Sequence, residues 1–255
     1  MKYLEQFHGL KIFHKKDAVA LIKNKDAAKE ILRRYRKRGL ISQVRRDLYV
    51  ATDLAFKTSL ATKFEIAGNI TPSSYLAYHA ALEYHGLAHQ FFYVLYISSK
   101  EKFKGFDYEG ISYEYFQSKS DAGVVNPVTD TLVRVTDLER TVLDCIDRID
   151  LSGGLEELIA CFAVLTSINE EKLLDYLHDF NKQILYQKTG FILGYFQKEM
   201  KLSDAFFELC RMKTGRNIWY LTDKQESDTY FKEWKLYAPK NILSFLEQGG
   251  GTEYV

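Results

Sequence analysis

The sequence contains little proline and little cysteine, and it has no long apolar run. Three prolines in 255 residues, with 46% hydrophobic and 15% aromatic residues, exclude extensive disorder and indicate a chain that can bury a core. The absence of an apolar run of about 18 residues excludes a membrane-spanning helix. The N-terminal residues lack the apolar stretch and cleavage site of a signal peptide, so we expect a cytoplasmic protein with no membrane partner.

The three cysteines give no sign of a disulfide framework or a redox motif. Cys145, Cys161 and Cys210 are odd in number, widely spaced and set in apolar helical patterns, and no Cys-x-x-Cys pair occurs. We therefore expect buried, reduced thiols. Phosphate-binding glycine loops and the common hydrolase and zinc-protease motifs are also missing, and we expect no cofactor, no metal and no catalytic residue.

The net charge of +1 conceals a strong asymmetry along the chain. Residues 1–50 contain 14 Lys and Arg but only five Asp and Glu, a net charge of +9, and the remaining residues carry −8. A segment this basic is typical of a surface that binds a polyanion, whereas the acidic remainder is not. The sequence therefore indicates two parts with different functions.

The basic segment has the element order of a winged helix-turn-helix. Short helices are predicted over 1–8 and 15–22, and a longer helix follows Asn24, a residue suited to the N-cap position. Gly39 ends this helix, and two β-like runs around 45–47 then form a hairpin. The apolar positions of the longer helix fall on a single stripe: Ala27, Ala28, Ile31, Leu32 and Tyr35.

We expect this segment to bind double-stranded DNA. The helix over 24–38 would enter the major groove, with Asn24 and Arg33 best able to make bidentate contacts to bases. The hairpin would direct Arg45 and Arg46 to the minor groove, and Lys15, Lys16 and residues 36–38 would hold phosphates. A solvated face on a helical adaptor and an RNA-binding surface are the alternatives. The predicted DNA-binding residues are Lys15, Lys16, Asn24, Lys25, Lys29, Arg33, Arg36, Lys37, Arg38, Arg45 and Arg46.

The rest of the chain is predicted to mix helices and strands. A helical pattern over 54–70 suggests a linking helix, so the predicted domains are 1–52 and 53–255, with 53–72 as the link. The fold class is α+β, an N-terminal winged helix-turn-helix domain followed by a larger mixed α/β domain. Thr136 and Glu139 predict a capping box, and the glycine-rich tail from Gln248 is expected to fray. Predicted helices cover 73–84, 137–149, 155–165, 170–180, 184–200 and 203–212, and predicted strands cover 92–98, 112–116, 132–135, 219–221 and 231–236.

Four segments in order resemble AbiEi-type antitoxins. The run 40–50 (LISQVRRDLYV) is similar to the end of that family's winged helix, and 74–87 (SYLAYHAALEYHGL) resembles its S-x-x-S-A-L-x-x-H-G-L helix. Residues 137–144 (DLERTVLD) resemble its E-R-T-x-L-D helix, and 187–193 (QKTGFIL) resemble a later K-R-x-G-x-L segment. The matches extend from about residue 10 to 200. The chain departs from the family at Asp47, where glycine is common, and at Lys188-Thr189 in place of Lys-Arg.

The resemblance implies a function that composition alone does not. Members of this family are antitoxins of type IV toxin–antitoxin systems linked to abortive phage infection. Their winged helix binds inverted repeats in their own promoter and represses the operon. Their C-terminal domain counters a nucleotidyltransferase-like toxin without requiring a stable complex. If the resemblance holds, this chain is a repressor and an antitoxin, not an enzyme.

Two clusters in the acidic part suggest other chemistry. His79, His85 and His89, with Glu83 between them, have helical spacing that a zinc site could use, although Gly86 interrupts the helix and packing roles are the alternative. Asp144 with Glu139 could serve a metal-dependent nuclease, although pairing of Glu139 with Arg140 and of Asp144 with Arg148 on a helix surface also fits. A winged-helix regulator with a ligand-sensing C-terminal domain is the remaining alternative.

Overall fold

The computed structural model describes residues 2–244 and 246, in two compact units. Unit 1 contains residues 1–76, 93–119 and 126–135, and unit 2 contains 77–92, 120–125 and 136–255. Helix accounts for 43% and strand for 18%, which confirms the α+β class. The basic segment shares unit 1 with later strands, and the predicted domain boundary at residue 52 stays a prediction. No helix among the described residues is long and apolar enough to cross a membrane.

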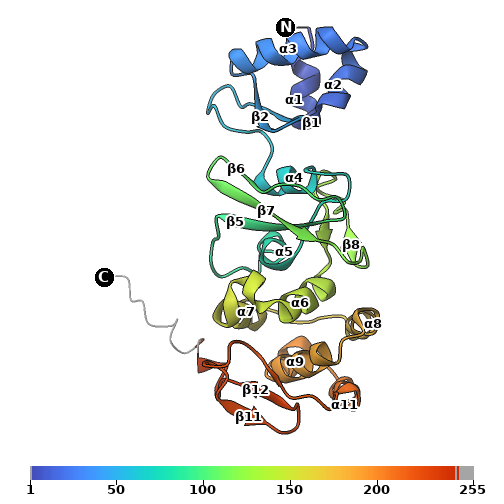
Figure 1. Cartoon of the computed structure of the whole chain (residues 1–255), viewed down its shortest axis with the longest axis vertical. Coiled ribbons are helices and arrows are strands. Elements are labelled where there is room, and N and C mark those ends of the chain that lie inside the picture. Colours follow the sequence, from blue (N-terminus) through green and yellow to red (C-terminus); the bar gives the residue numbers. More distant parts are fainter. Residues whose placement is uncertain (1, 245, 247–255) are drawn as a thin grey trace, which may run out of the picture. The chain divides into compact units, whose positions relative to one another are not determined.

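Residues 4–51 form a winged helix (Figure 1). Its elements in chain order are α1 (Leu4–Leu10), β1 (Ile12–His14), α2 (Lys15–Ile22), α3 (Lys25–Lys37), β2 (Ile41–Arg45) and β3 (Leu48–Ala51). The strands pair antiparallel in the order β1-β3-β2, so β2 lies at an edge. Strand β1 was not predicted from the sequence, whereas α2 and α3 match their predicted ranges closely.

Aromatic side chains hold this winged helix together. Phe7 stacks on Phe13 with ring centroids 4.5 Å apart and meets Tyr35 edge-on at 6.0 Å. Phe13 also stacks on Tyr49 of β3 at 5.8 Å, so α1, α3 and the sheet share one aromatic cluster. Pairs of this kind contribute about 1 kcal/mol each beyond the burial of their surface. The core therefore fixes α3 against the sheet and leaves its other faces in solvent.

Helix α3 begins and ends as its sequence predicts. The Asn24 side chain accepts a hydrogen bond from the Ala27 amide at 2.9 Å, which satisfies one of the free N–H groups of the first turn. Ala28, Leu32 and Tyr35 are buried along one stripe. Gly39 follows the helix with φ +68°, the left-handed conformation that glycine adopts without strain.

The predicted linking helix over 54–70 is wrong in its extent. An isolated β-bridge joins Thr52 to Ser59, and helix α4 covers only Lys63–Gly68. Thr62 and Glu65 form a reciprocal capping box that starts α4, which explains why the helix begins there.

Unit 1 also contains most of the larger sheet, in the order β6-β7-β5-β4-β9. Its strands are β4 (Tyr75–Leu76), β5 (Val94–Ser99), β6 (Phe106–Tyr108), β7 (Ile111–Gln117) and β9 (Val135–Thr136). Strand β5 pairs parallel with β7 and antiparallel with β4. The predicted helix over 73–84 is therefore wrong in its first part, because β4 pairing precedes the helix. Strand β6 was not predicted.

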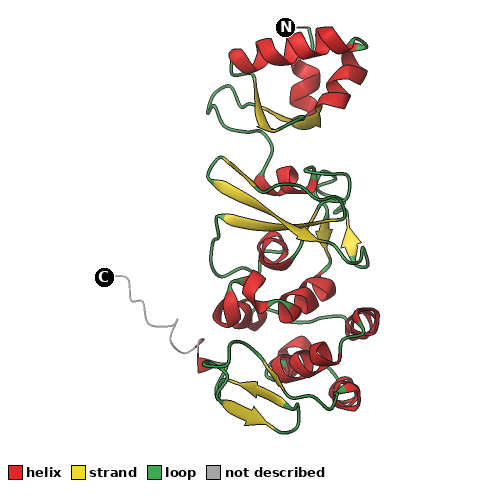
Figure 2. Ribbon diagram, viewed as in Figure 1, coloured by secondary structure: helices red, strands yellow, loops and turns green. Residues whose placement is uncertain are grey.

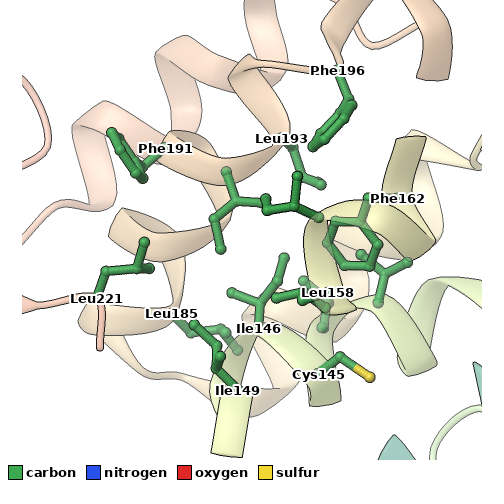
Figure 3. Packing of buried hydrophobic residues seen from close by; sticks show 14 of the residues in the cluster. Cys145, Ile146, Ile149, Leu158, Phe162, Leu185, Phe191, Leu193, Phe196 and Leu221 are labelled. Carbon is green, nitrogen blue, oxygen red and sulfur yellow. The ribbon is translucent and has the colours of Figure 1, made fainter. Parts of the chain in front are cut away.

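Unit 2 is mostly helical, with a small sheet in the order β10-β12-β11 (Figure 2). Its core combines residues of α6, α7, α9 and α11, including Ile146, Leu158, Phe162 and Leu193 (Figure 3). The elements are α5 (Tyr78–Tyr84), β8 (Val124–Val125), α6 (Leu138–Asp147), a 3-10 helix (Ile149–Ser152), α7 (Gly154–Ala163), α8 (Glu170–Phe180), α9 (Gln183–Gly194), α10 (Gln197–Met200), α11 (Asp204–Lys213), β10 (Trp219–Tyr220), β11 (Thr229–Phe231) and β12 (Leu236–Ala238).

The start of α6 differs from its prediction. Asp137, rather than Thr136, is the N-cap, and its carboxylate accepts from the Arg140 amide at 2.9 Å. The Thr136 hydroxyl instead bonds to the Thr141 hydroxyl at 2.7 Å. A strand that ends at Thr136 moves the cap by one residue. The predicted frayed tail from Gln248 lies outside the described residues.

Candidate nucleic-acid interface

One face of α3 carries a line of cations. Lys25, Lys29, Arg33 and Lys37 recur every four residues, which places them on one side of the helix, and Arg36 falls beside them. All five are exposed, while the apolar stripe turns into the core. A helix of 13 residues is about 20 Å long and narrow enough to lie in the major groove of B-DNA. The structure thus brings together the predicted residues of this helix on an accessible surface.

Two shallow concavities adjoin the C-terminal half of this line. The first, about 530 Å³, is lined by Arg33, Arg36 and Lys37 on α3 and by residues 41–43 on β2. The second, about 510 Å³, adds Arg38 and residues of the loop 52–57, including Lys57. Ser42, Gln43 and Lys57 were not predicted as interface residues. The charge of Lys57 gave a signal in the sequence, but its position beside α3 depends on the Thr52–Ser59 bridge.

Arg33 has a partner on its own helix. Its Nε and Nη2 donate to the two carboxylate oxygens of Glu30, at 3.1 and 2.7 Å. The hydrogen bond lowers the pKa of Glu30 and raises that of Arg33. Both side chains are exposed, so solvent screens this ion pair and DNA phosphates can compete for the guanidinium.

Asn24 does not have both of its polar atoms available for a base. Its Oδ1 caps α3, and a bidentate contact to adenine requires the amide oxygen together with the amide nitrogen. The structure therefore makes Asn24 a helix-capping residue, and only its Nδ2 group is available to donate to DNA.

The wing tip presents Arg46 to solvent. Its side chain is 94% exposed. The turn depends on Asp47, which adopts φ +63°, a conformation that aspartate tolerates better than most residues. The Asp47 carboxylate lies 3.8 Å from Arg46 Nε and 4.0 Å from Lys15 Nζ. The acid reduces the positive potential at this tip.

The side chain of Arg45, unlike that of Arg46, packs against aromatic rings of the protein. A register shift after Gln43 marks a β-bulge in β2, so Ile41 and Val44, three residues apart, are both buried. The Arg45 guanidinium lies over the rings of Phe103 and Phe106, and its burial lowers its pKa. The predicted minor-groove contact of Arg45 conflicts with this placement.

The two predicted phosphate-binding residues of α2 are Lys15 and Lys16. Lys15 is half-buried, and its backbone amide donates to the Asp47 carbonyl at 2.9 Å, which ties α2 to the wing. Lys16 is exposed and lines a separate polar concavity of about 320 Å³ that also includes Arg134. These positions are compatible with phosphate contacts outside the groove.

The three clustered histidines of unit 2, His79, His85 and His89, have contacts within the protein. His79 Nε2 lies 3.1 Å from Oε1 of the fully buried Glu157, and the backbone amides of His89 and Gln90 donate to the same oxygen. His85 Nε2 bonds to the Thr136 carbonyl at 2.8 Å. Within residues 2–244 and 246, no three His, Cys, Asp or Glu side chains are grouped as a metal site would need.

Asp144 and Glu139 are also engaged, and the predicted surface pairs are wrong. Asp144 Oδ1 accepts from Arg140 Nε at 2.9 Å, both side chains are buried, and burial raises the pKa of Asp144 to about 6. Arg148 pairs with Asp150 instead. Glu139 Oε1 accepts from the Asn169 amide at 3.0 Å. These contacts give the acids of α6 a structural role.

The three cysteines are free and buried, as their sequence setting predicts. Burial raises the pKa of Cys161 and of Cys210 to about 12, and that of Cys145 well above its usual value. Thiols in this state are poor nucleophiles because the thiolate is the reactive form.

Comparison with known proteins gives a fold relationship. No protein-family model and no curated protein matches the chain. Among solved structures, the crystal structure of the Rv2827c protein from Mycobacterium tuberculosis is similar, with a TM-score of 0.61 at 13% sequence identity. The alignment covers 94% of this chain and 89% of that protein. The likeness shows that the two chains share a fold over nearly their whole lengths.

Proposed function

We propose that this protein is a DNA-binding transcriptional repressor that autoregulates its operon and acts as the antitoxin of a type IV toxin–antitoxin system. The line of exposed cations on α3 carries the DNA-binding part of this proposal, because it lies on a helix held by a winged-helix core. The cations on α3 would contact phosphates or bases, and Arg46 would extend the contact from the wing. The α3 cations are Lys25, Lys29, Arg33, Arg36 and Lys37. The antitoxin part depends on the resemblance of four segments to AbiEi-type antitoxins.

Binding to the protein's own promoter is the first test. The protein is footprinted on the DNA upstream of its gene, and protection of an inverted repeat is expected. The double variant Lys29→Ala/Arg33→Ala should lose the footprint. Arg34→Ala is the matched control, because Arg34 is exposed on the same helix but lies off the cation line. Unchanged protection by the double variant would contradict the assignment of α3.

Neutralisation is the second test. The chain is expressed together with a nucleotidyltransferase-like gene from immediately downstream, and growth is measured. Growth should be rescued by the whole chain, and also by the Lys29→Ala/Arg33→Ala variant when both genes are driven by foreign promoters. Toxicity that persists with the whole chain present would rule out the antitoxin role and leave the DNA-binding role standing.

A concavity in unit 2 supports a second candidate, a regulator that senses a ligand. It has a volume of about 370 Å³ and is lined by aromatic residues and by the pair Arg211–Glu233. Apolar pockets with a few polar groups are typical of small-molecule sites. Under this alternative, a small molecule would bind here and change promoter affinity. Thermal-shift screening of the purified protein would detect the binding, and anisotropy titration with the ligand present would measure the change in affinity.

A further inference from the structure

The wing is attached to the β6–β7 hairpin through Arg45. The Arg45 guanidinium carbon lies 5.4 Å from the ring centroid of Phe103 and 5.3 Å from that of Phe106. A cation this close to the face of an aromatic ring is attracted by the ring quadrupole, and the attraction grows when water is excluded. We call these three residues the wing anchor.

Both rings of the wing anchor pack against strand β7. Phe106 stacks on Tyr113 with centroids 5.0 Å apart, and Phe103 meets Tyr115 edge-on at 5.4 Å. Phe103 and Tyr113 are buried. Because both partners belong to β7, the guanidinium rests on a rigid surface rather than on mobile side chains.

A hydrogen bond within β2 fixes the backbone that carries Arg45. Gln43 Nε2 donates to the Arg45 carbonyl at 3.1 Å and closes the bulge. The end of β2 next to the turn is therefore held both by this bond and by the contact of Arg45 with the two rings.

The orientation of the wing tip follows from this attachment. Arg46 is the first residue of the turn that follows β2, so the contact of Arg45 with the rings fixes the point from which this turn begins. Arg46 is 94% exposed.

We propose that Arg45 is a positioning residue for DNA binding, which holds the wing through Phe103 and Phe106 and does not itself contact DNA. The proposal rests on the DNA-binding function proposed above. It makes the DNA-binding unit larger than residues 1–52, since the β6–β7 hairpin becomes part of what orients the wing.

Four variants of the whole chain test this: Arg45→Met, Arg45→Lys, Phe106→Leu and the double variant Arg45→Met/Phe106→Leu. Affinity for a promoter duplex is measured by fluorescence anisotropy over a range of salt concentrations. Arg45→Met and Phe106→Leu should each weaken promoter binding several-fold with little change in its salt dependence. The double variant should bind no more weakly than whichever single variant has the lower affinity. Arg45→Lys should recover part of the affinity, because it restores a cation over the rings.

Arg46→Ala provides the comparison for a residue that touches DNA. Loss of one phosphate contact lowers the slope of log K against log salt by about one. The proposal is overturned if Arg45→Met behaves like Arg46→Ala while Phe106→Leu keeps wild-type affinity, since Arg45 would then be a DNA contact.

A readout without DNA keeps the two proposals separate. Urea unfolding of the same variants gives the coupling between Arg45 and Phe106, which should be about fivefold in the unfolding equilibrium constant for a partly buried cation–π contact. Additive effects would disprove the wing anchor even if promoter binding is found. Absence of promoter binding by the wild-type protein would instead refute the proposed function and the positioning role, whatever the coupling.

Discussion

Arg33 and Glu30 form a bidentate pair on the exposed side of α3, with donor–acceptor distances of 3.1 and 2.7 Å. The pair sits inside the line of cations that we assign to DNA. Glu30 therefore does two opposing things: it holds the Arg33 side chain in one geometry, and it places a negative charge where phosphates would bind. Removal of this charge separates the two effects.

Glu30→Gln should strengthen promoter binding. Loss of the carboxylate frees the Arg33 guanidinium and makes the interface more positive, so affinity should rise several-fold and depend more steeply on salt. Anisotropy titrations at two salt concentrations measure both quantities. Glu5→Gln, which neutralises an exposed acid on α1, should change affinity less. Weaker binding of Glu30→Gln would show that the fixed geometry of Arg33 matters more than its charge.

Asn24 offers a test of capping against base recognition. Asn24→Ala should lower the free energy of unfolding by about 1 kcal/mol, because the Ala27 amide loses its acceptor. Asn24→Ser retains a capping oxygen and should keep both stability and promoter affinity. Chemical denaturation and anisotropy measure the two. A Ser variant that is stable but binds the promoter poorly would restore the direct base contact that the sequence suggested.

The close approach of Trp234 to α9 requires a glycine at position 190. A Cβ at this position would lie 2.2 Å from Cζ3 of Trp234, whereas a Cβ at Gly194, one turn along α9, would meet no atom closer than 3.9 Å. Gly190→Ala should therefore destabilise the protein by about 1–3 kcal/mol through overpacking. Gly194→Ala should be neutral or stabilising, since alanine favours helix. Equal effects of the two changes on urea unfolding would contradict this packing.

The raised pKa of Asp144 predicts a pH dependence of stability. Its pKa is about 6 in the folded protein, compared with 3.8 for an aspartate in an unfolded chain. The folded state therefore holds this proton more tightly than the unfolded state. The resulting stabilisation is complete below about pH 4 and is lost as pH rises through about 6. Asp144→Asn cannot titrate.

The stability of wild type relative to Asp144→Asn should therefore fall between pH 4 and pH 7, as measured by urea unfolding at several pH values. A difference that is constant, or that grows with pH, would show that Arg140 holds Asp144 ionised in the folded protein.

The local pattern of the winged helix allowed much of it to be predicted. The apolar stripe of α3, its cap at Asn24 and the turn at Asp47 are all set by neighbours in sequence. Strand β1 was not predicted because it has only three residues. It forms a strand through its pairing with β3, which is far along the chain. The direction of Arg45 was missed for a related reason, since a one-residue bulge changes which face a side chain occupies.

The charged residues of α6 show a second limit. Glu139, Arg140 and Asp144 resemble the exposed face of an amphipathic helix, yet all three are buried. Their burial is tolerated because each has a partner: Arg140 pairs with Asp144 and donates to the Ala122 carbonyl at 2.7 Å, and Glu139 accepts from the Asn169 amide. Partners from other elements are a property of the tertiary fold, which local periodicity does not contain.

The salt dependence of promoter binding tests the central claim most directly. Wild type and Lys29→Ala/Arg33→Ala are titrated onto the upstream duplex from low to physiological salt. For wild type, log K should fall linearly with log salt. Each phosphate contact contributes about 0.9 to the steepness of this slope, and several contacts are expected. The double variant should lose the contribution of about two contacts. A wild-type affinity that does not change with salt, or a slope that is the same in the variant, would contradict the assignment of the α3 cations to DNA.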